Sequence, residues 1–310
     1  MNKPIIAVVG ATASGKSALS VQLAKKHNGV VISADSMQVY KGMDIGTGKV
    51  TEEEKEEIPH FMIDVVSPMS PYNVAMYRDM AKKIIEQTYS RNQIPIICGG
   101  TGLYVNALLY PMGLTGKEST LASREKWQCR LKTLGADGLH QLLSEMNPTV
   151  AEKIHPNNTR RVIRALEIIE NGGEESEALA EAAYVRRDFS YRNTVIIGLR
   201  WQRAELRQRI FKRVDLMLRS GLLDETRALL SQGVDPGGTA MQGLGYKQLI
   251  PVIFGTASLA QATEEIKLRT CQYAKRQLSW FRREKRTVWL DCDGKTTEKL
   301  VREAEAVIDG

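Results

Sequence analysis

The sequence predicts an α/β fold in which helices flank a parallel sheet and a separate helical domain is inserted. Over the first hundred residues, short apolar runs alternate with amphipathic helical patterns, which is typical of a parallel sheet covered on both faces. Such runs are absent from about 115 to 185, where helical patterns follow one another. We therefore expect a core formed by residues 1–114 and 190–310, with a helical insertion over 115–189.

The elements follow from these patterns in chain order. The apolar runs predict strands at 5–9, 30–33, 61–66, 94–98, 194–199 and 288–291. Amphipathic spacing predicts core helices after residue 15, over 73–89, 202–231 and 259–286, and in the last residues. Within the insertion it predicts helices at 121–134, 137–146, 159–171 and 174–183.

A glycine-rich loop joins the first strand to the first helix. It matches the pattern G-x-x-x-x-G-K-[ST], which makes the expected core P-loop NTPase-like. The residues of this loop are Gly10, Ala11, Thr12, Ala13, Ser14, Gly15, Lys16 and Ser17. In such a loop the main-chain N–H groups and the Lys16 ammonium bind phosphate oxygens, and the Ser17 hydroxyl can ligate Mg²⁺. A glycine turn that matches by chance is the weaker interpretation.

Apart from this loop, the sequence has few of the elements that usually bind a nucleoside triphosphate. The predicted strand at 94–98 ends in Cys-Gly-Gly-Thr, without the carboxylate that usually helps to hold the metal. There is also no N-K-x-D element of the kind that reads a guanine base. A diphosphate carried by something other than a nucleoside fits the loop equally well.

A carboxylate follows the second predicted strand. Asp35 is the first acidic residue after Lys16 and is expected at the carboxyl edge of the sheet, where α/β proteins bind ligands. A carboxylate there can take a proton from an incoming nucleophile. The alternative is a turn or helix-cap aspartate with a local role.

Three basic stretches accompany a net charge of +7. One lies over 200–219, where Arg209 and Arg213 share a helix face, and a second lies over 267–286 among aromatic residues. The third is the set Arg160, Arg161 and Arg164 in the insertion. Together they favour a nucleic acid partner, although solvated helix faces and a membrane surface are alternatives.

The combination of motifs resembles the tRNA dimethylallyltransferases, also called tRNA isopentenyltransferases, of bacterial type. The resemblance extends over nearly the whole chain and rests on residues 10–17, 32–47, 99–104, 154–167, 243–247 and 273–282. It implies transfer of a dimethylallyl group from dimethylallyl diphosphate to the N6 amine of the adenosine next to the anticodon on its 3′ side. The anticodon stem-loop of tRNA and Mg²⁺ are then the expected partner and cofactor.

The resemblance also implies roles for individual residues. Asp35 takes the proton of the amine, while Ser17 with its metal ion and Arg213, followed by Arg209, stabilise the leaving diphosphate. The residues expected to bind tRNA are Asp35, Ser36, Met37, Gln38, Thr101, Arg124, Thr159, Arg160, Arg161, Val162, Ile163, Met241, Gln242, Gly243, Leu244, Gly245 and Tyr246. Gly48 stands where the family commonly has alanine, and we expect this difference to change only loop stiffness.

Two rival functions remain at this point. A small-molecule or nucleotide kinase would use the same loop and turn over ATP, and a non-catalytic RNA-binding protein would bind tRNA without forming a product. The four cysteines form no C-x-x-C pair, and the sequence has no run of 18 apolar residues. We therefore expect a cytoplasmic monomer with no membrane segment.

Overall fold

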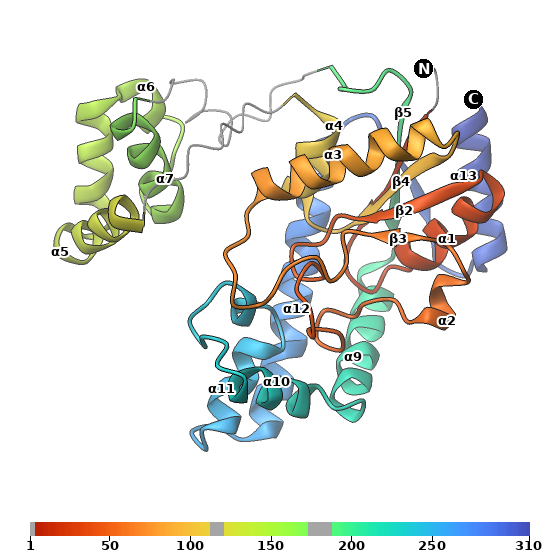
Figure 1. Cartoon of the computed structure of the whole chain (residues 1–310). Coiled ribbons are helices and arrows are strands. Elements are labelled where there is room, and N and C mark those ends of the chain that lie inside the picture. Colours follow the sequence, from red (N-terminus) through yellow and green to blue (C-terminus); the bar gives the residue numbers. More distant parts are fainter. Residues whose placement is uncertain (1–3, 112–120, 173–187) are drawn as a thin grey trace. The chain divides into compact units, whose positions relative to one another are not determined.

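The computed structural model describes residues 4–111, 121–172 and 188–310, and the chain divides into two compact units. The core unit comprises Met1–Leu109 and Phe189–Gly310, and the helical unit comprises Tyr110–Asp188. The division expected from the sequence had placed these boundaries at 114/115 and 189/190. Figure 1 shows the sheet of the core unit and the helices of the helical unit.

The core unit contains one six-stranded sheet, in which every pair of neighbouring strands is parallel. Its strands are β1 (Ile5–Gly10), β2 (Gly29–Ser33), β3 (His60–Phe61), β4 (Ile94–Gly99), β5 (Thr194–Arg200) and β6 (Thr287–Asp291). Their order is β3-β2-β4-β1-β5-β6. The predicted α/β class is confirmed, and the carboxyl ends of β1, β2 and β4 meet at one edge.

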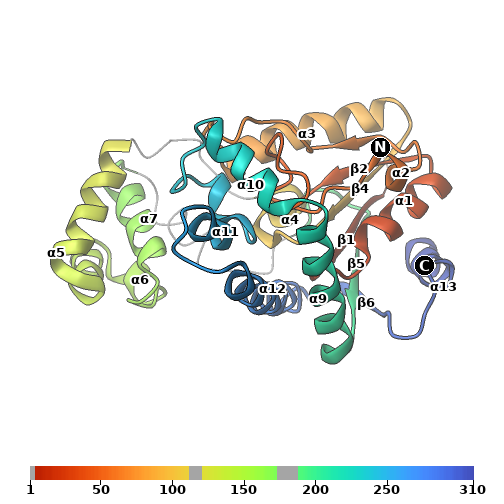
Figure 2. The same ribbon diagram turned by 90° about the horizontal axis from the view of Figure 1, so that it is seen from below.

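Helices cover both faces of the sheet (Figures 1 and 2). The helices of the core unit are α1 (Lys16–Lys26), α2 (Glu52–Lys55), α3 (Val74–Ser90), α4 (Gly102–Leu109), α9 (Arg203–Arg219), α10 (Leu222–Ser231), α11 (Tyr246–Ile253), α12 (Leu259–Phe281) and α13 (Thr297–Asp309). Helices α1 and α13 pack on one face, and α3, α4 and α12 pack on the other. Because β1 is covered on both sides, all six of its residues are buried.

Apolar side chains of the sheet and of two helices form the main core. Ile6 and Val8 point from β1 into a cluster that also contains Leu19 and Leu23 of α1 and Val301 of α13. This packing fixes the start of α1 against the end of β1. The loop between them, which carries the phosphate-binding motif, is therefore held on a rigid base.

Two predicted elements differ from the structure in extent. The strand predicted over 61–66 is reduced to β3, because Met62 and Asp64 have φ values of 62° and 55°, which leave the strand conformation. The helix predicted over 202–231 is divided into α9 and α10 at Gly221, whose φ of 100° interrupts the helix.

Other helix ends and short helices also differ. Helix α12 ends at Phe281, before the predicted end at 286. Helix α4 was not predicted, because six of its eight residues are buried and it lacks a polar face to give it a helical pattern.

The helical unit contains α5 (Leu121–Met146), α6 (Pro148–Ala151) and α7 (Thr159–Glu170). Gly135, with φ 71° and ψ −178°, breaks α5 where the sequence predicts two helices. Trp127, Leu143, Val150 and Leu166 belong to the apolar cluster of this unit. The predicted helix at 174–183 lies outside the described residues.

Candidate active site

The phosphate loop adopts a backbone that its two glycines make possible. Gly10 has a φ of 145°, and a Cβ there would lie 2.9 Å from the main-chain oxygen of Leu199. Gly15 has a φ of 93° and begins α1 with no side-chain cap. The first N–H groups of α1 are therefore directed into the loop, in the geometry that binds anions at helix N-termini.

Two side chains from distant parts of the chain hold the loop in place. The Gln277 Oε1 atom accepts a hydrogen bond from the Thr12 N–H at 2.8 Å, and its Nε2 donates to the Gly100 oxygen at 3.0 Å. Trp201 Nε1 donates to the Ser14 oxygen at 2.9 Å. Sequence reasoning missed Gln277 and Trp201 as parts of the site. Gln277 lies in a motif that carried the resemblance, and Trp201 lies near the start of the basic stretch over 200–219. Neither pattern indicates which residue the side chain contacts.

The position and the pKa of the Lys16 ammonium group suit the binding of an anion. Its ammonium donates to the Ala11 oxygen at 2.6 Å. The pKa of Lys16 is lowered to about 8, mainly by burial and in smaller part by the nearby Arg213, while the Cys98 and Asp35 groups oppose this effect. A diphosphate bound in the loop would compensate the buried charge, because an anion favours the protonated form.

Arg213 and Arg209 have different surroundings, although they share one face of α9. Arg213 is half-buried, and its Nη2 donates to the Gly48 oxygen at 3.2 Å. Burial lowers the pKa of Arg213, and the charge of Asp35 opposes this. Arg209 is exposed, lies over the Trp201 ring at 4.2 Å and donates to the Ala13 oxygen at 2.9 Å. Of these two arginines, Arg213 is thus the one whose charge interacts with the charges of Lys16 and Asp35.

Asp35 follows β2 at the sheet edge and is half-buried. Its Oδ1 accepts from the Met37 N–H at 2.9 Å, which is the local turn contact that the alternative interpretation expected. The same carboxylate also acts electrostatically on Lys16, Arg213 and Tyr273. Asp35 therefore has both a local structural contact and a position among the charged groups of the site.

Hydrogen bonds join the segments that follow β2 and β4. The Ser36 N–H donates to Thr101 Oγ1 at 3.0 Å, and the Thr101 N–H donates to the Ala34 oxygen at 3.1 Å. A Cβ at Gly99 would overlap the Ala34 main chain, so glycine allows this close approach. Ser36 and Thr101 thus lie together next to Asp35, and their expected contact with tRNA stays a prediction.

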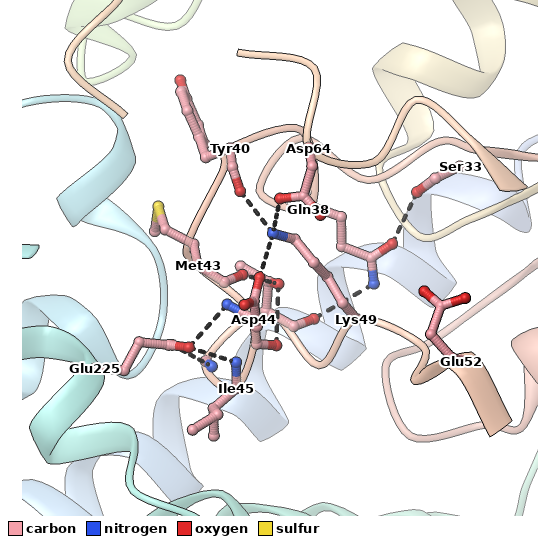
Figure 3. Close-up of polar contacts among 12 residues, drawn as sticks. Ser33, Gln38, Tyr40, Met43, Asp44, Ile45, Lys49, Glu52, Asp64 and Glu225 are labelled. Carbon is pink, nitrogen blue, oxygen red and sulfur yellow. Dashed lines mark hydrogen bonds and ion pairs between the residues drawn. The ribbon is translucent and has the colours of Figure 1, made fainter. Parts of the chain in front are cut away.

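The side chain of Gln38 is engaged within the protein. Its Oε1 accepts from Ser33 Oγ at 2.8 Å, and its Nε2 donates to the Gly48 oxygen at 3.3 Å (Figure 3). The Met37 side chain points towards Gly243, where an added Cβ would lie 3.0 Å from the Met37 methyl group. Met37 and Gln38 therefore connect the turn after β2 with two other loops.

The segment 241–246 offers less side-chain surface than the sequence indicated. Met241 and Tyr246 are fully buried, and the Tyr246 hydroxyl donates to Glu225 Oε1 at 2.6 Å. Gln242 is exposed and Leu244 is half-buried. Of the four side chains in this segment, those of Gln242 and Leu244 remain available to a ligand, while Gly243 and Gly245 provide main chain alone.

The helical unit presents its own set of predicted tRNA contacts. At the start of α7, Arg160 is exposed, and Thr159 and Arg161 are half-buried. Val162 and Ile163 were expected to bind tRNA through this element, but their side chains belong to the apolar cluster of the unit. Their burial assigns them to packing of the helix that carries Arg160.

Arg124 faces a buried carboxylate of the same unit. Its Nε lies 3.6 Å from Glu167 Oε1, and Arg164 Nη1 lies 3.3 Å from Glu167 Oε2. Glu167 is fully buried, so these two arginines compensate its charge. Arg124 remains exposed at its outer side.

A glycine-rich phosphate loop at the edge of an all-parallel sheet, with a lysine, an arginine and a carboxylate around it, defines a P-loop-type α/β phosphate-binding protein. The model of the IPP transferase family matches residues 38–284, and that of isopentenyl transferase matches residues 3–70. The chain belongs to the IPP transferase family.

Similar proteins cover almost the whole chain. It is 43% identical over 300 residues to a tRNA dimethylallyltransferase of Caldanaerobacter subterraneus. The alignment covers 96% of this chain and 95% of the relative. It is 44% identical over 290 residues to the tRNA dimethylallyltransferase of Bacillus subtilis, with coverages of 93% and 91%. The family resemblance inferred from the motifs is confirmed.

Solved structures give the same result. A tRNA isopentenylpyrophosphate transferase from Bacillus halodurans aligns with a TM-score of 0.74 at 39% identity, over 100% of this chain and 96% of that one. A eukaryotic dimethylallyltransferase described as acting on tRNA aligns with a TM-score of 0.82 at 32% identity, over 99% and 80%. Within the part of this chain that the structure describes, no helix is long and apolar enough to cross a membrane.

Proposed function

We propose that this protein transfers a dimethylallyl group from dimethylallyl diphosphate to the N6 amine of the adenosine on the 3′ side of the tRNA anticodon. The observation that carries the proposal is the phosphate loop between β1 and α1, which contains Lys16 and lies at the same edge of the sheet as Asp35, with the charge of Arg213 nearby. This arrangement combines a proton acceptor with two cations at a phosphate loop. The similar proteins are tRNA dimethylallyltransferases, which supports the same reaction.

At the donor end, the site residues stabilise a leaving diphosphate. The bond between the allylic carbon and the diphosphate oxygen breaks, and the electron pair leaves with the oxygen. The loop N–H groups, Lys16 and Arg213 compensate the charge that develops there. Ser14 Oγ is buried and has no hydrogen-bond partner among the described residues, so it is available to a phosphate oxygen.

At the acceptor end, the adenine amine forms the new bond to the allylic carbon. Its lone pair is delocalised into the ring, and a carboxylate that takes the N6 proton therefore helps the reaction. Asp35 is that acceptor, with Ser36 and Thr101 beside it. The base has to leave its stack to reach this position, so a flipped adenosine is expected.

The residues present also suit Mg²⁺, although no group of three or more His, Cys, Asp or Glu residues is gathered among the described residues. Mg²⁺ often keeps water ligands and binds mainly through substrate phosphates, so the Ser17 hydroxyl and a diphosphate provide suitable oxygens. Burial raises the pKa of the nearby Cys98 thiol, against the effect of Lys16 and of Ser20 and Ser17, so it provides no thiolate ligand. When bound, Mg²⁺ would neutralise charge on the leaving group.

The partner follows from charge and from the family. We infer that Arg160 and its neighbours on α7 and the basic residues of α12 contact the phosphates of the anticodon stem-loop. The four cysteines are free, which suits a reducing compartment such as the cytoplasm. A monomeric state remains a prediction.

The test is mass spectrometry of nucleosides from unmodified tRNA incubated with the protein, Mg²⁺ and dimethylallyl diphosphate, with ATP as a parallel donor. The expected result is a dimethylallyl mass gain on adenosine that is absent with ATP. Conversion of ATP to ADP without any mass gain would instead support the kinase alternative, which the family assignment does not favour.

A further inference from the structure

One carboxylate of α10 accepts four hydrogen bonds from two other segments. Figure 3 shows those that come from the main chain around Ile45. Glu225 Oε2 accepts from the main-chain N–H groups of Asp44 at 2.9 Å and Ile45 at 2.8 Å. Its Oε1 accepts from the Gly46 N–H at 3.0 Å and from the Tyr246 hydroxyl at 2.6 Å. Hydrogen bonds to an ionised carboxylate are stronger than neutral ones, so this contact fixes the loop 44–48 firmly.

The loop 44–48 in turn holds two residues of the site. The Gly48 oxygen accepts from Arg213 Nη2 at 3.2 Å and from Gln38 Nε2 at 3.3 Å. The turn is closed by the Gly48 N–H, which donates to the Ile45 oxygen at 3.0 Å. Because Glu225 binds the Ile45 N–H on the same turn, it determines where the Gly48 oxygen points.

Tyr246 extends the same connection to the segment 241–246. A Cβ at Gly46 would overlap the Tyr246 ring, so the ring lies directly against the loop. Burial raises the pKa of Tyr246, and the charge of Glu225 adds to this. The phenol therefore remains protonated and donates to Glu225.

We propose that Glu225 is a positioning residue for the transfer reaction. It acts through the loop 44–48 by placing the Gly48 oxygen. This oxygen orients the Arg213 side chain towards the leaving diphosphate, and it also orients the Gln38 side chain beside Asp35. The inference rests on the proposed function, because it assigns Arg213 its role at the diphosphate. The hydrogen bonds of Glu225 go to the loop 44–48 and to Tyr246, so its effect on the reaction is indirect.

A second attachment keeps the loop folded when Glu225 is changed. Lys49 Nζ donates to the Tyr40 oxygen at 2.7 Å and pairs with Asp44 at 2.7 Å and Asp64 at 2.5 Å. Its side chain is only 6% exposed. These contacts do not involve Glu225, so the isosteric variant Glu225→Gln is expected to fold with a loosened turn.

The experiment is a double-mutant cycle on single-turnover transfer at saturating tRNA and dimethylallyl diphosphate. Glu225→Gln should lower the rate about 10- to 100-fold, because an amide cannot accept all four hydrogen bonds. In an Arg213→Ala background, the same change should alter the rate by less than about twofold, since residues that act as a unit are not additive. The control is Asp224→Asn, which removes a charge from the same turn of α10 without touching the loop.

A further variant and the possible outcomes test the positioning role of Glu225. Tyr246→Phe keeps the ring and removes one donor, so it should lower the rate about 2- to 5-fold with the same dependence on Arg213. A fully additive effect of Glu225→Gln and Arg213→Ala, with unchanged melting temperatures, would overturn the positioning role. An unchanged rate in Glu225→Gln would also overturn it. Absence of transfer by the unaltered protein is a different result, since it rejects the proposed function itself.

Discussion

Gln277 joins two loops that are far apart in the sequence, because its amide accepts from the Thr12 N–H at 2.8 Å while donating to the Gly100 oxygen. The side chain is 5% exposed, so neither partner could exchange it for water without rearrangement. The phosphate loop after β1 and the glycine turn after β4 are thereby held at a fixed separation. The diphosphate and the base are expected to bind on either side of this connection.

Replacing Gln277 by alanine should weaken both the fold and the diphosphate site. The N–H of the half-buried Thr12 and the carbonyl of the buried Gly100 would lose their partners, at a cost of about 1–3 kcal/mol in the free energy of unfolding. Chemical denaturation and calorimetric binding of diphosphate would measure the two effects. Gln272→Ala, at an exposed position of the same helix, is the control. Equal behaviour of the two variants would contradict the connecting role.

Asp35→Asn should lower transfer about 10²- to 10⁴-fold, the range for loss of a general base. Asparagine retains an oxygen that can accept from the Met37 N–H, so the turn after β2 should persist. The measurement is single-turnover transfer, with tRNA affinity and melting temperature as controls for folding. Transfer at the unaltered rate would remove Asp35 from the mechanism.

The affinity for diphosphate should fall as the pH rises through about 8. Burial lowers the pKa of Lys16 to about 8 from its ordinary value of 10.5, so above this pH the free site loses its ammonium charge. Calorimetric titrations of the unaltered protein and of Lys16→Met at several pH values would isolate the effect, because ionisation of the ligand cancels in the comparison. Parallel pH profiles for the two proteins would contradict it.

The same pKa has a consequence for stability without ligand. Since the pKa is lower in the folded state than in the unfolded state, the folded protein is penalised below pH 8. Lys16 should therefore contribute a gain in the free energy of unfolding as the pH rises from about 8 to 10.5. Lys16→Met should remove this gain, which denaturation at each pH would detect.

Arg160→Ala should weaken tRNA binding and reduce the slope of log affinity against log salt by about one, as expected for loss of a single phosphate contact. Lys299→Ala, which removes an exposed charge from α13, is the matched control. Filter binding or fluorescence anisotropy over a range of salt concentrations would give both slopes. An unchanged slope for Arg160→Ala would argue against α7 as a tRNA contact.

Local patterns in the sequence predicted much of the fold and part of the site. The phosphate loop, the strand before it and Asp35 after β2 lie within short segments, so pattern and spacing were sufficient. Gln277 and Glu225 were missed because their partners lie 265 and about 180 residues away, and no local pattern records such contacts.

Helical spacing also did not show which of the two arginines of α9 is half-buried and which is exposed. Arg209 and Arg213 share a face, and only the position of Gly48 and Trp201 shows which one lies beside Asp35 and which one is exposed. Gly48 was expected to affect loop stiffness alone, but a Cβ there would overlap the Arg213 guanidinium. Its effect therefore includes the space that Arg213 occupies.

The contact of Glu225 with the loop 44–48 has a consequence for ligand selection. Three successive main-chain N–H groups form a concave donor surface of the kind that captures free phosphate in many proteins. Here the protein's own carboxylate occupies that surface as a permanent internal anion. The three donors are therefore already engaged, and we expect a diphosphate to bind at the loop after β1 rather than at the loop 44–48.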